Sequence, residues 1–128
     1  MRHFLIAAAL VAASPALAQD AARGERLFED NCAVCHGLGL RGDGPMAEVL
    51  VVEPPDLTRI AERNDGFSRV GVARQIDGRD PLLSHGSDMP LFGYIFGEMS
   101  AVIREGGRTI LTAPEVVDLV AYLESVQE

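Results

Sequence analysis

The stretch "NCAVCHG", Asn31–Gly37, contains both cysteines of the chain, and His36 directly follows the second. Cysteines two residues apart can close a redox disulfide, supply half of a zinc site or attach a haem. The order C-A-V-C-H over residues 32–36 matches the haem-attachment pattern at every position. Thiols at Cys32 and Cys35 can reach the two vinyl groups of one porphyrin, and His36 then lies over the ring face, where its imidazole can bind iron.

The first residues have the composition of a secretory signal peptide. Arg2 precedes an apolar run over residues 4–13, a Ser-Pro break and the small-x-small sequence A-L-A at residues 16–18. We therefore expect residues 1–18 to be a signal peptide that directs the protein to the periplasm and is cleaved after Ala18. The run is shorter than the roughly 20 apolar residues that cross a bilayer. No second such run follows, so no integral membrane segment is expected after cleavage.

The remaining residues, 19–128, contain no linker, repeat or low-complexity tract. Their number, 128 − 18 = 110, suits one compact domain. Loss of Arg2 leaves 10 basic and 19 acidic residues, a formal charge of 10 − 19 = −9, and every basic residue is an arginine. A charge of this sign repels nucleic acid, which is therefore not an expected partner. It favours solubility, or a partner with a basic docking face.

Three other uses of the motif fit the surrounding sequence less well. A zinc site needs four ligands. After the signal peptide only His85 is left to complete the set formed by Cys32, Cys35 and His36, and the last two are adjacent on the chain. A reactive dithiol expects its pair at the start of a helix, whereas this pair ends a helical pattern. A structural disulfide across two residues would constrain almost no loop.

The rest of the sequence predicts helices joined by Gly- and Pro-rich loops. A first helix is predicted from Asp20, a candidate N-cap, to Gly37, and a short one over residues 67–76, with Gly78 after its end. Residues 49–52 are either a brief strand or a buried loop wall, and residues 99–107 are predicted to form one or two helical turns. The last helix is predicted within residues 112–126, with Thr112 and Glu115 as a capping box.

On these residues the chain resembles a class I, mono-haem c-type cytochrome. Gly24, Phe28 and Cys32 repeat the family's glycine–aromatic–cysteine spacing. Leu119, Tyr122 and Leu123 resemble the apolar–aromatic pair of its last helix. The resemblance implies an all-α, class I cytochrome c fold, in which crossed N- and C-terminal helices, with short helices and loops, wrap one haem. It also implies that residues 19–128 form a single cytochrome c domain with one covalent haem c.

A haem iron bound by His36 needs a second axial ligand. Met89, in "SDMPLFG", resembles the family's Met-Pro axial segment and is the ligand that the resemblance implies. Met46 lies too close to His36 in sequence to reach the other face easily, and Met99 falls in the segment predicted as helical, where a core role is expected. His85 stays open as an alternative ligand that would lower the reduction potential.

The surroundings of the haem are less determined by the sequence. The family's Gly-Pro loop supplies a carbonyl to the axial histidine, and Gly44-Pro45 resembles that loop, although a plain turn explains it equally well. The candidate donors to the haem propionates are four arginines and a tyrosine, which the sequence does not rank. They are Arg41, Arg59, Arg74, Arg79 and Tyr94.

His/Met ligation leaves no open iron site, so electron transfer is expected rather than catalysis. The first hypothesis is a soluble periplasmic mono-haem carrier of single electrons between redox proteins, and not an enzyme. Two alternatives remain: a dedicated cytochrome subunit of a periplasmic oxidoreductase complex, docking through residues such as Tyr94, Ile95 and Phe96, and a haem enzyme or gas sensor in which Met89 is displaced.

Overall fold

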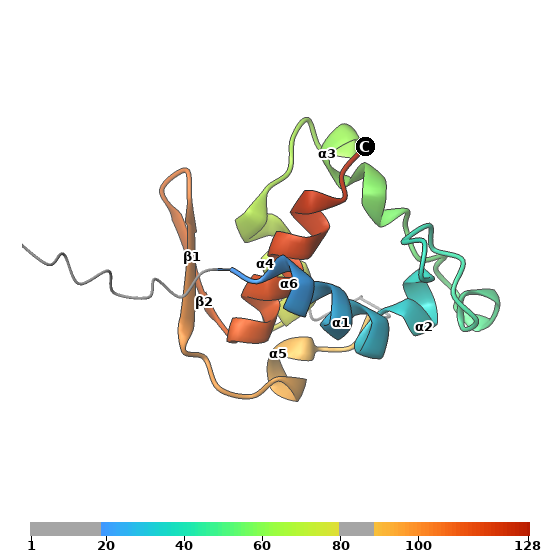
Figure 1. The fold of residues 1–128 in the computed structure, drawn as a ribbon, viewed down its shortest axis with the longest axis horizontal. Coiled ribbons are helices and arrows are strands. Elements are labelled where there is room, and N and C mark those ends of the chain that lie inside the picture. Colours follow the sequence, from blue (N-terminus) through green and yellow to red (C-terminus); the bar gives the residue numbers. More distant parts are fainter. Residues whose placement is uncertain (1–18, 80–88) are drawn as a thin grey trace, which may run out of the picture.

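A computed structural model of the chain describes residues 19–79 and 89–128. The expected signal peptide and His85 lie outside these ranges. Within them the chain is mostly helical, with one antiparallel sheet of two strands (Figure 1). The elements are the helices α1 (Ala21–Asn31), α2 (Ala33–His36), α3 (Ile60–Arg63), α4 (Arg69–Asp77), α5 (Phe92–Ile95) and α6 (Pro114–Ser125), the 3-10 turns η1 (Ala47–Val49) and η2 (Leu57–Arg59), and the strands β1 (Ala101–Glu105) and β2 (Arg108–Thr112).

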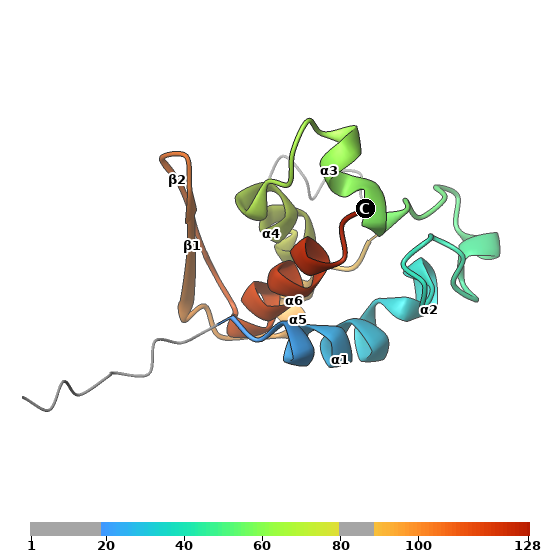
Figure 2. The ribbon, with the colours of Figure 1, turned by 45° about the horizontal axis from the view of Figure 1, so that its top comes forward.

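The first and last helices pack directly against each other, as the resemblance implied (Figures 1 and 2). Gly24 is at the closest approach, because a Cβ atom there would overlap the carbonyl oxygen of Asp118 and lie 2.8 Å from Cβ of Tyr122. One turn along α1, the ring of Phe28 lies 5.7 Å from that of Tyr122. Phe28 and Leu119 are fully buried between the helices. This helix pair forms the centre of the core.

The predicted ends of two helices are confirmed. The Asp20 carboxylate accepts a hydrogen bond from the backbone N–H of Arg23 and caps α1. The helical path is interrupted at Cys32, continues as α2 and ends at Gly37. Ser68 caps α4, and Gly78, in the left-handed conformation, ends it.

The segment predicted as helical turns over residues 99–107 is instead the first part of a β-hairpin. β1 and β2 pair antiparallel with Ile103 opposite Ile110, and Gly106 and Gly107 form the two-residue turn. Both glycines have positive φ angles, which the primed hairpin turns require. Ile103 is buried while its neighbours Val102 and Arg104 are exposed, so burial alternates with the period of a strand. The hairpin stands to one side of the helices (Figure 2).

The predicted capping box of the last helix is wrong. The N-cap of α6 is Ala113, without a side-chain hydrogen bond, and Pro114 is the first helical residue. Thr112 is the last residue of β2, so its hydroxyl lies too early in the chain to cap the helix. It donates to Asp77 at 2.6 Å instead, and Glu115 accepts from Arg23 at 2.7 Å.

Two smaller expectations also fail. Residues 49–52 form neither a strand nor a buried wall: Val49 ends η1, and Val51 is 96% exposed. Met99 is 49% exposed just before β1 and has no core role. No helix of the described residues is long and apolar enough to span a membrane.

Candidate functional site

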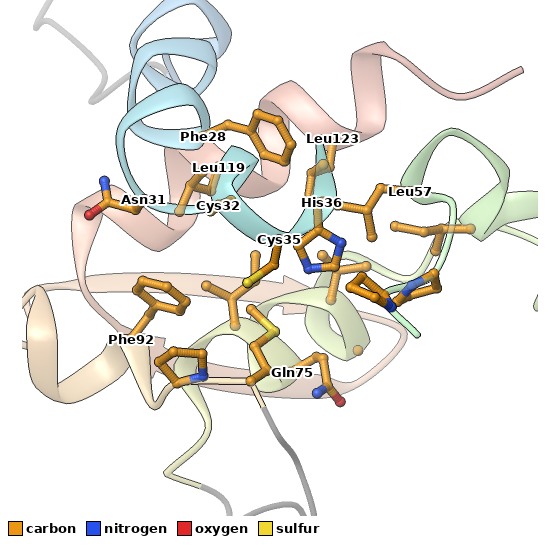
Figure 3. A pocket seen from close by; sticks show the side chains of 18 of the residues that line it. Phe28, Asn31, Cys32, Cys35, His36, Leu57, Gln75, Phe92, Leu119 and Leu123 are labelled. Atoms are coloured by element: carbon orange, nitrogen blue, oxygen red, sulfur yellow. The ribbon is translucent and has the colours of Figure 1, made fainter. Parts of the chain in front are cut away.

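A cavity of about 900 Å³ opens beside the crossed helices, within the roughly 300–1,000 Å³ typical of cofactor sites. Most of its lining is apolar, and Phe28, Leu119 and Leu123 form the wall made by α1 and α6. Figure 3 shows Cys35 and His36 side by side at this cavity, with Gln75 of α4 and Phe92 of α5 across from them. The cavity therefore has a predominantly apolar interior with a few sulfur and nitrogen atoms at its wall.

The structure brings the motif residues together at this wall. The backbone N–H groups of Cys35 and His36 both donate to the carbonyl of Cys32, at 3.1 and 2.9 Å. This single helical turn puts all three side chains along the cavity. The two thiols are free, and no disulfide joins them.

The Cys32 thiol lacks the lowered pKa that a reactive dithiol needs, and the described residues lack the ligand cluster that a zinc site needs. Burial, with a smaller contribution from Cys35, raises the pKa of the Cys32 thiol to about 12. Cys32 is therefore protonated at neutral pH, whereas redox-active thiols have a lowered pKa. Within residues 19–79 and 89–128, no three Cys, His, Asp or Glu side chains are grouped to hold a metal ion. These findings leave covalent modification of the thiols as the better explanation.

His36 presents a half-buried imidazole that lacks a full set of polar partners. Burial lowers its pKa, and the nearby carbonyl of Pro55 partly offsets this effect, so the ring is neutral at pH 7. Nδ1 is buried and makes no hydrogen bond of ordinary geometry with any described residue. A neutral imidazole with an unsatisfied ring nitrogen suits an iron ligand.

The prolyl carbonyl beside His36 belongs to Pro55, not to the Gly44-Pro45 turn that the sequence suggested. The Gly44-Pro45 turn instead packs against α2. The N–H of Gly44 donates to the carbonyl of Cys35 at 3.1 Å, and a Cβ atom on Gly44 would lie 2.6 Å from backbone atoms of α2. The turn therefore closes the end of α2 behind the motif.

Met89, the axial ligand that the resemblance implies, lines the same cavity and is partly buried. It belongs to a segment more than fifty residues after His36, so the chain returns to the cavity from a second direction. Met46 and Met99 do not line the cavity, and both are exposed. The structure thus brings Met89, and neither of those two methionines, together with Cys32, Cys35 and His36.

The five candidate propionate donors are all described, and none of them lines the cavity. Arg41, for example, pairs with Asp56 at 3.1 Å and with Glu128 at 2.6 Å. The arginines at the cavity are Arg63 and Arg108, which the sequence analysis missed. Arg108 belongs to the unpredicted hairpin, so recognition of the Gly-Gly turn would have been the signal for it.

These features together fit a haem, because a large apolar cavity accepts the porphyrin while two thiols and a neutral imidazole occupy one wall. The sequence agrees over nearly the whole domain: residues 21–127 match the family model described as Cytochrome c. The chain belongs to the cytochrome c family. Members carry covalently attached haem c and transfer electrons to and from redox protein partners. Searches of curated proteins and of solved structures found no match to this cytochrome.

Proposed function

We propose that this cytochrome is a mono-haem carrier of single electrons, in which Cys32 and Cys35 hold the haem and His36 and Met89 are the axial ligands. The observation that carries the proposal is that these four side chains, from two distant segments, line one predominantly apolar cavity. When bound, the haem supplies the one-electron iron couple. The protein contributes two tethering thiols, a neutral imidazole and a soft thioether, which raises the reduction potential.

The absorption spectrum of the oxidised holoprotein tests the axial pair. Methionine ligation gives a weak near-infrared sulfur-to-iron band, and we expect that band in the protein at neutral pH. Its absence would remove Met89 from the proposal. Rapid carbon monoxide binding by the reduced protein would favour the gas sensor or enzyme, because it requires a displaceable Met89.

The proposed location is the periplasm, on the basis of the signal-peptide pattern in residues 1–18. Expression of the full chain in a host with a c-type maturation system tests this proposal. We expect the mature protein to begin at Gln19 and to be released with the periplasmic fraction. An uncleaved chain in the membrane fraction would contradict the proposal.

The proposed partner is a redox protein with a basic docking face. The rim of the cavity has exposed valines, Val34 and Val52, and Val51 next to Val52 is almost fully exposed. Glu48 and Glu53 are exposed in the same segment, and Glu53 lines the cavity. An apolar centre with acidic neighbours suits a partner whose contact surface is apolar with a basic rim.

The alternative of a dedicated subunit rests on a different surface. Tyr94 and Ile95 in α5 are exposed and do not line the cavity, whereas Phe96 is partly buried and stacks on Phe92 at 5.6 Å. Size-exclusion chromatography of a native extract separates the two functions. A carrier elutes as a small protein, and co-elution with a larger oxidoreductase would favour the subunit.

A further inference from the structure

An ion pair lies at the point where the chain leaves α4 toward Met89. Asp77, the last residue of α4, is 4% exposed. Its Oδ1 accepts a hydrogen bond from Nε of Arg79 at 2.6 Å, and its Oδ2 accepts one from Nη2 at 2.5 Å. Two parallel bonds of this kind fix the orientation of both side chains. Neither residue lines the cavity, so the pair does not belong to the haem wall itself.

A third partner reaches the same carboxylate from the hairpin. The hydroxyl of Thr112 donates to Oδ2 of Asp77 at 2.6 Å, and Thr112 is fully buried. Thr112 is the last residue of β2 and comes two residues before α6. Asp77 therefore connects the end of α4 with Arg79, two residues later, and with Thr112 at the junction between the hairpin and α6.

Residues 91–93, which follow Met89, pack against the Asp77–Arg79 pair and the neighbouring Gly78. A Cβ atom on Gly93, in α5, would overlap Nε of Arg79 and lie 2.5 Å from Oδ1 of Asp77. A Cβ atom on Gly78 would lie 2.6 Å from Cδ2 of Leu91. Residues 77–79 and 91–93 thus lie against each other, and Met89 is two residues before Leu91.

Without these partners, a charged Asp77 at this position would lower the stability of the folded state. A carboxylate at the C-terminal end of a helix is disfavoured by the helix dipole, and burial of an unpaired charge is more costly still. The Arg79 guanidinium and the Thr112 hydroxyl offset both costs. Because Gly93 packs directly on the Asp77–Arg79 pair, the loss of Asp77 would loosen the contact of residues 91–93 with the end of α4.

We propose that Asp77, Arg79 and Thr112 form a clamp against which residues 91–93 pack, and that this contact holds Met89, two residues earlier, in place to bind the haem iron. The clamp rests on the proposed axial role of Met89. Asp77 is a positioning residue in this scheme, because it acts on the iron only through Met89. When residues 91–93 are fixed by this contact, Met89 has less conformational entropy to lose on binding, so its bond to the iron is stronger.

Imidazole competition tests the clamp in the oxidised holoprotein. Free imidazole must displace Met89 to bind the iron, so its apparent affinity reports how firmly Met89 is held. In Asp77→Asn we expect imidazole to remove the near-infrared band at a concentration at least about tenfold lower than in the wild type. Loss of one partner from a buried ion pair costs more than the 1.4 kcal/mol that corresponds to a tenfold change.

A second pair of variants keeps the test valid if Asp77→Asn folds poorly. Thr112→Val removes only the hydroxyl and retains the shape of the side chain, so it should also increase the apparent imidazole affinity. Thr112→Ser retains the hydroxyl and should restore wild-type affinity. A structural role of the threonine methyl group would give the opposite order.

Asp118→Asn is the matched control. Asp118 is similarly buried and accepts hydrogen bonds from Nη1 of Arg23 at 2.7 Å and from the N–H of Asp20 at 2.9 Å, far from the Met89 segment in sequence. The variant Asp118→Asn should lower the midpoint of thermal unfolding. It should change the imidazole affinity by less than about twofold, because sites without shared partners act independently.

Two results would overturn the clamp: unchanged imidazole affinity in both Asp77→Asn and Thr112→Val, or an equal increase in Asp118→Asn. Absence of the near-infrared band from the wild-type protein would instead contradict the axial role of Met89. The failure of the clamp is therefore distinguishable from the failure of the proposed function.

Discussion

At the scale of the residue, the proposed axial role of Met89 is tested by comparing its replacement with that of Met99. Met89→Ala removes the proposed axial sulfur, so the near-infrared band should disappear and the reduced protein should bind carbon monoxide. The reduction potential should fall by on the order of 100 mV, part of the span of about 0.8 V that axial ligands control. Protein-film voltammetry and carbon monoxide titration measure these changes.

Met99→Ala is the control for that variant, because Met99 is half exposed and does not line the cavity. It should retain the wild-type spectrum and potential. If Met99→Ala lost the band while Met89→Ala kept it, the axial assignment would be wrong.

Asp77 should give the protein an acid-sensitive increment of stability. Burial tends to raise its pKa, but hydrogen bonds from Arg79 and Thr112 outweigh burial, and the pKa lies below its usual value. A lowered carboxyl pKa stabilises the folded state above the unfolded value of about 3.9, and the increment is lost as the pH falls through the folded pKa. Asp77→Asn should therefore cost roughly 3–5 kcal/mol near pH 7 and progressively less below about pH 4.

Guanidinium unfolding from pH 7 to pH 3 measures this difference between wild type and variant. Glu62→Gln is a suitable control, since Glu62 pairs with Arg59 at an exposed position and its loss should change the stability little at any pH. A cost of Asp77→Asn that did not vary with pH would contradict the ionic role of Asp77.

At the scale of the element, the contact of α1 with α6 depends on the absence of a side chain at one position. Gly24→Ala puts a methyl group into the carbonyl of Asp118, so the helices must separate. We expect a loss of roughly 1–3 kcal/mol in the free energy of unfolding. Gly39→Ala is the matched control: its Cβ would meet nothing closer than 3.7 Å, so we expect a change within about 0.5 kcal/mol. Equal stability of the two variants in denaturant unfolding would contradict the close crossing.

The elements that the sequence predicted correctly are those with local signals. Asp20 and Gly78 lie at the ends of helices because capping involves only neighbouring residues. The Cys-x-x-Cys-His motif was equally clear, since one helical turn is enough to align its three functional side chains. Gly24 and Phe28 indicated the helix crossing through the family resemblance that their spacing supports.

The missed features all depend on residues that are distant in sequence. Thr112 was assigned to a helix cap, but its partner is Asp77, 35 positions away. The hairpin was missed because its first strand was predicted as helical turns that end at the glycines, and Arg108 was missed with it. Pro55, rather than Pro45, approaches His36 because of how the loop between η1 and η2 folds back, which no local pattern reveals.

At the scale of the whole molecule, the negative charge should govern the reactions with charged redox reagents. The full chain has a formal charge of −8, and without Arg2 the charge is −9. Reduced protein should therefore react faster with a cationic oxidant than a neutral protein would, and an increase in ionic strength should slow the reaction, because the Debye length falls to about 10 Å at 0.1 M.

Stopped-flow oxidation by a cationic cobalt complex and by anionic ferricyanide measures this effect. The two reagents should show opposite salt dependence, with the anionic reaction accelerated by salt. A cationic reaction that is also accelerated by salt would mean that the electron leaves through a locally basic surface, and would contradict a basic docking face on the partner.

The central claim is that this chain holds one haem through Cys32 and Cys35, and a denaturing mass measurement tests it most directly. The protein is expressed with a c-type maturation system, unfolded, separated from unbound cofactor and weighed. We predict the mass of the polypeptide plus one haem, with no haem retained by a variant in which both cysteines are replaced by alanine. A wild-type mass equal to that of the polypeptide alone would contradict the account.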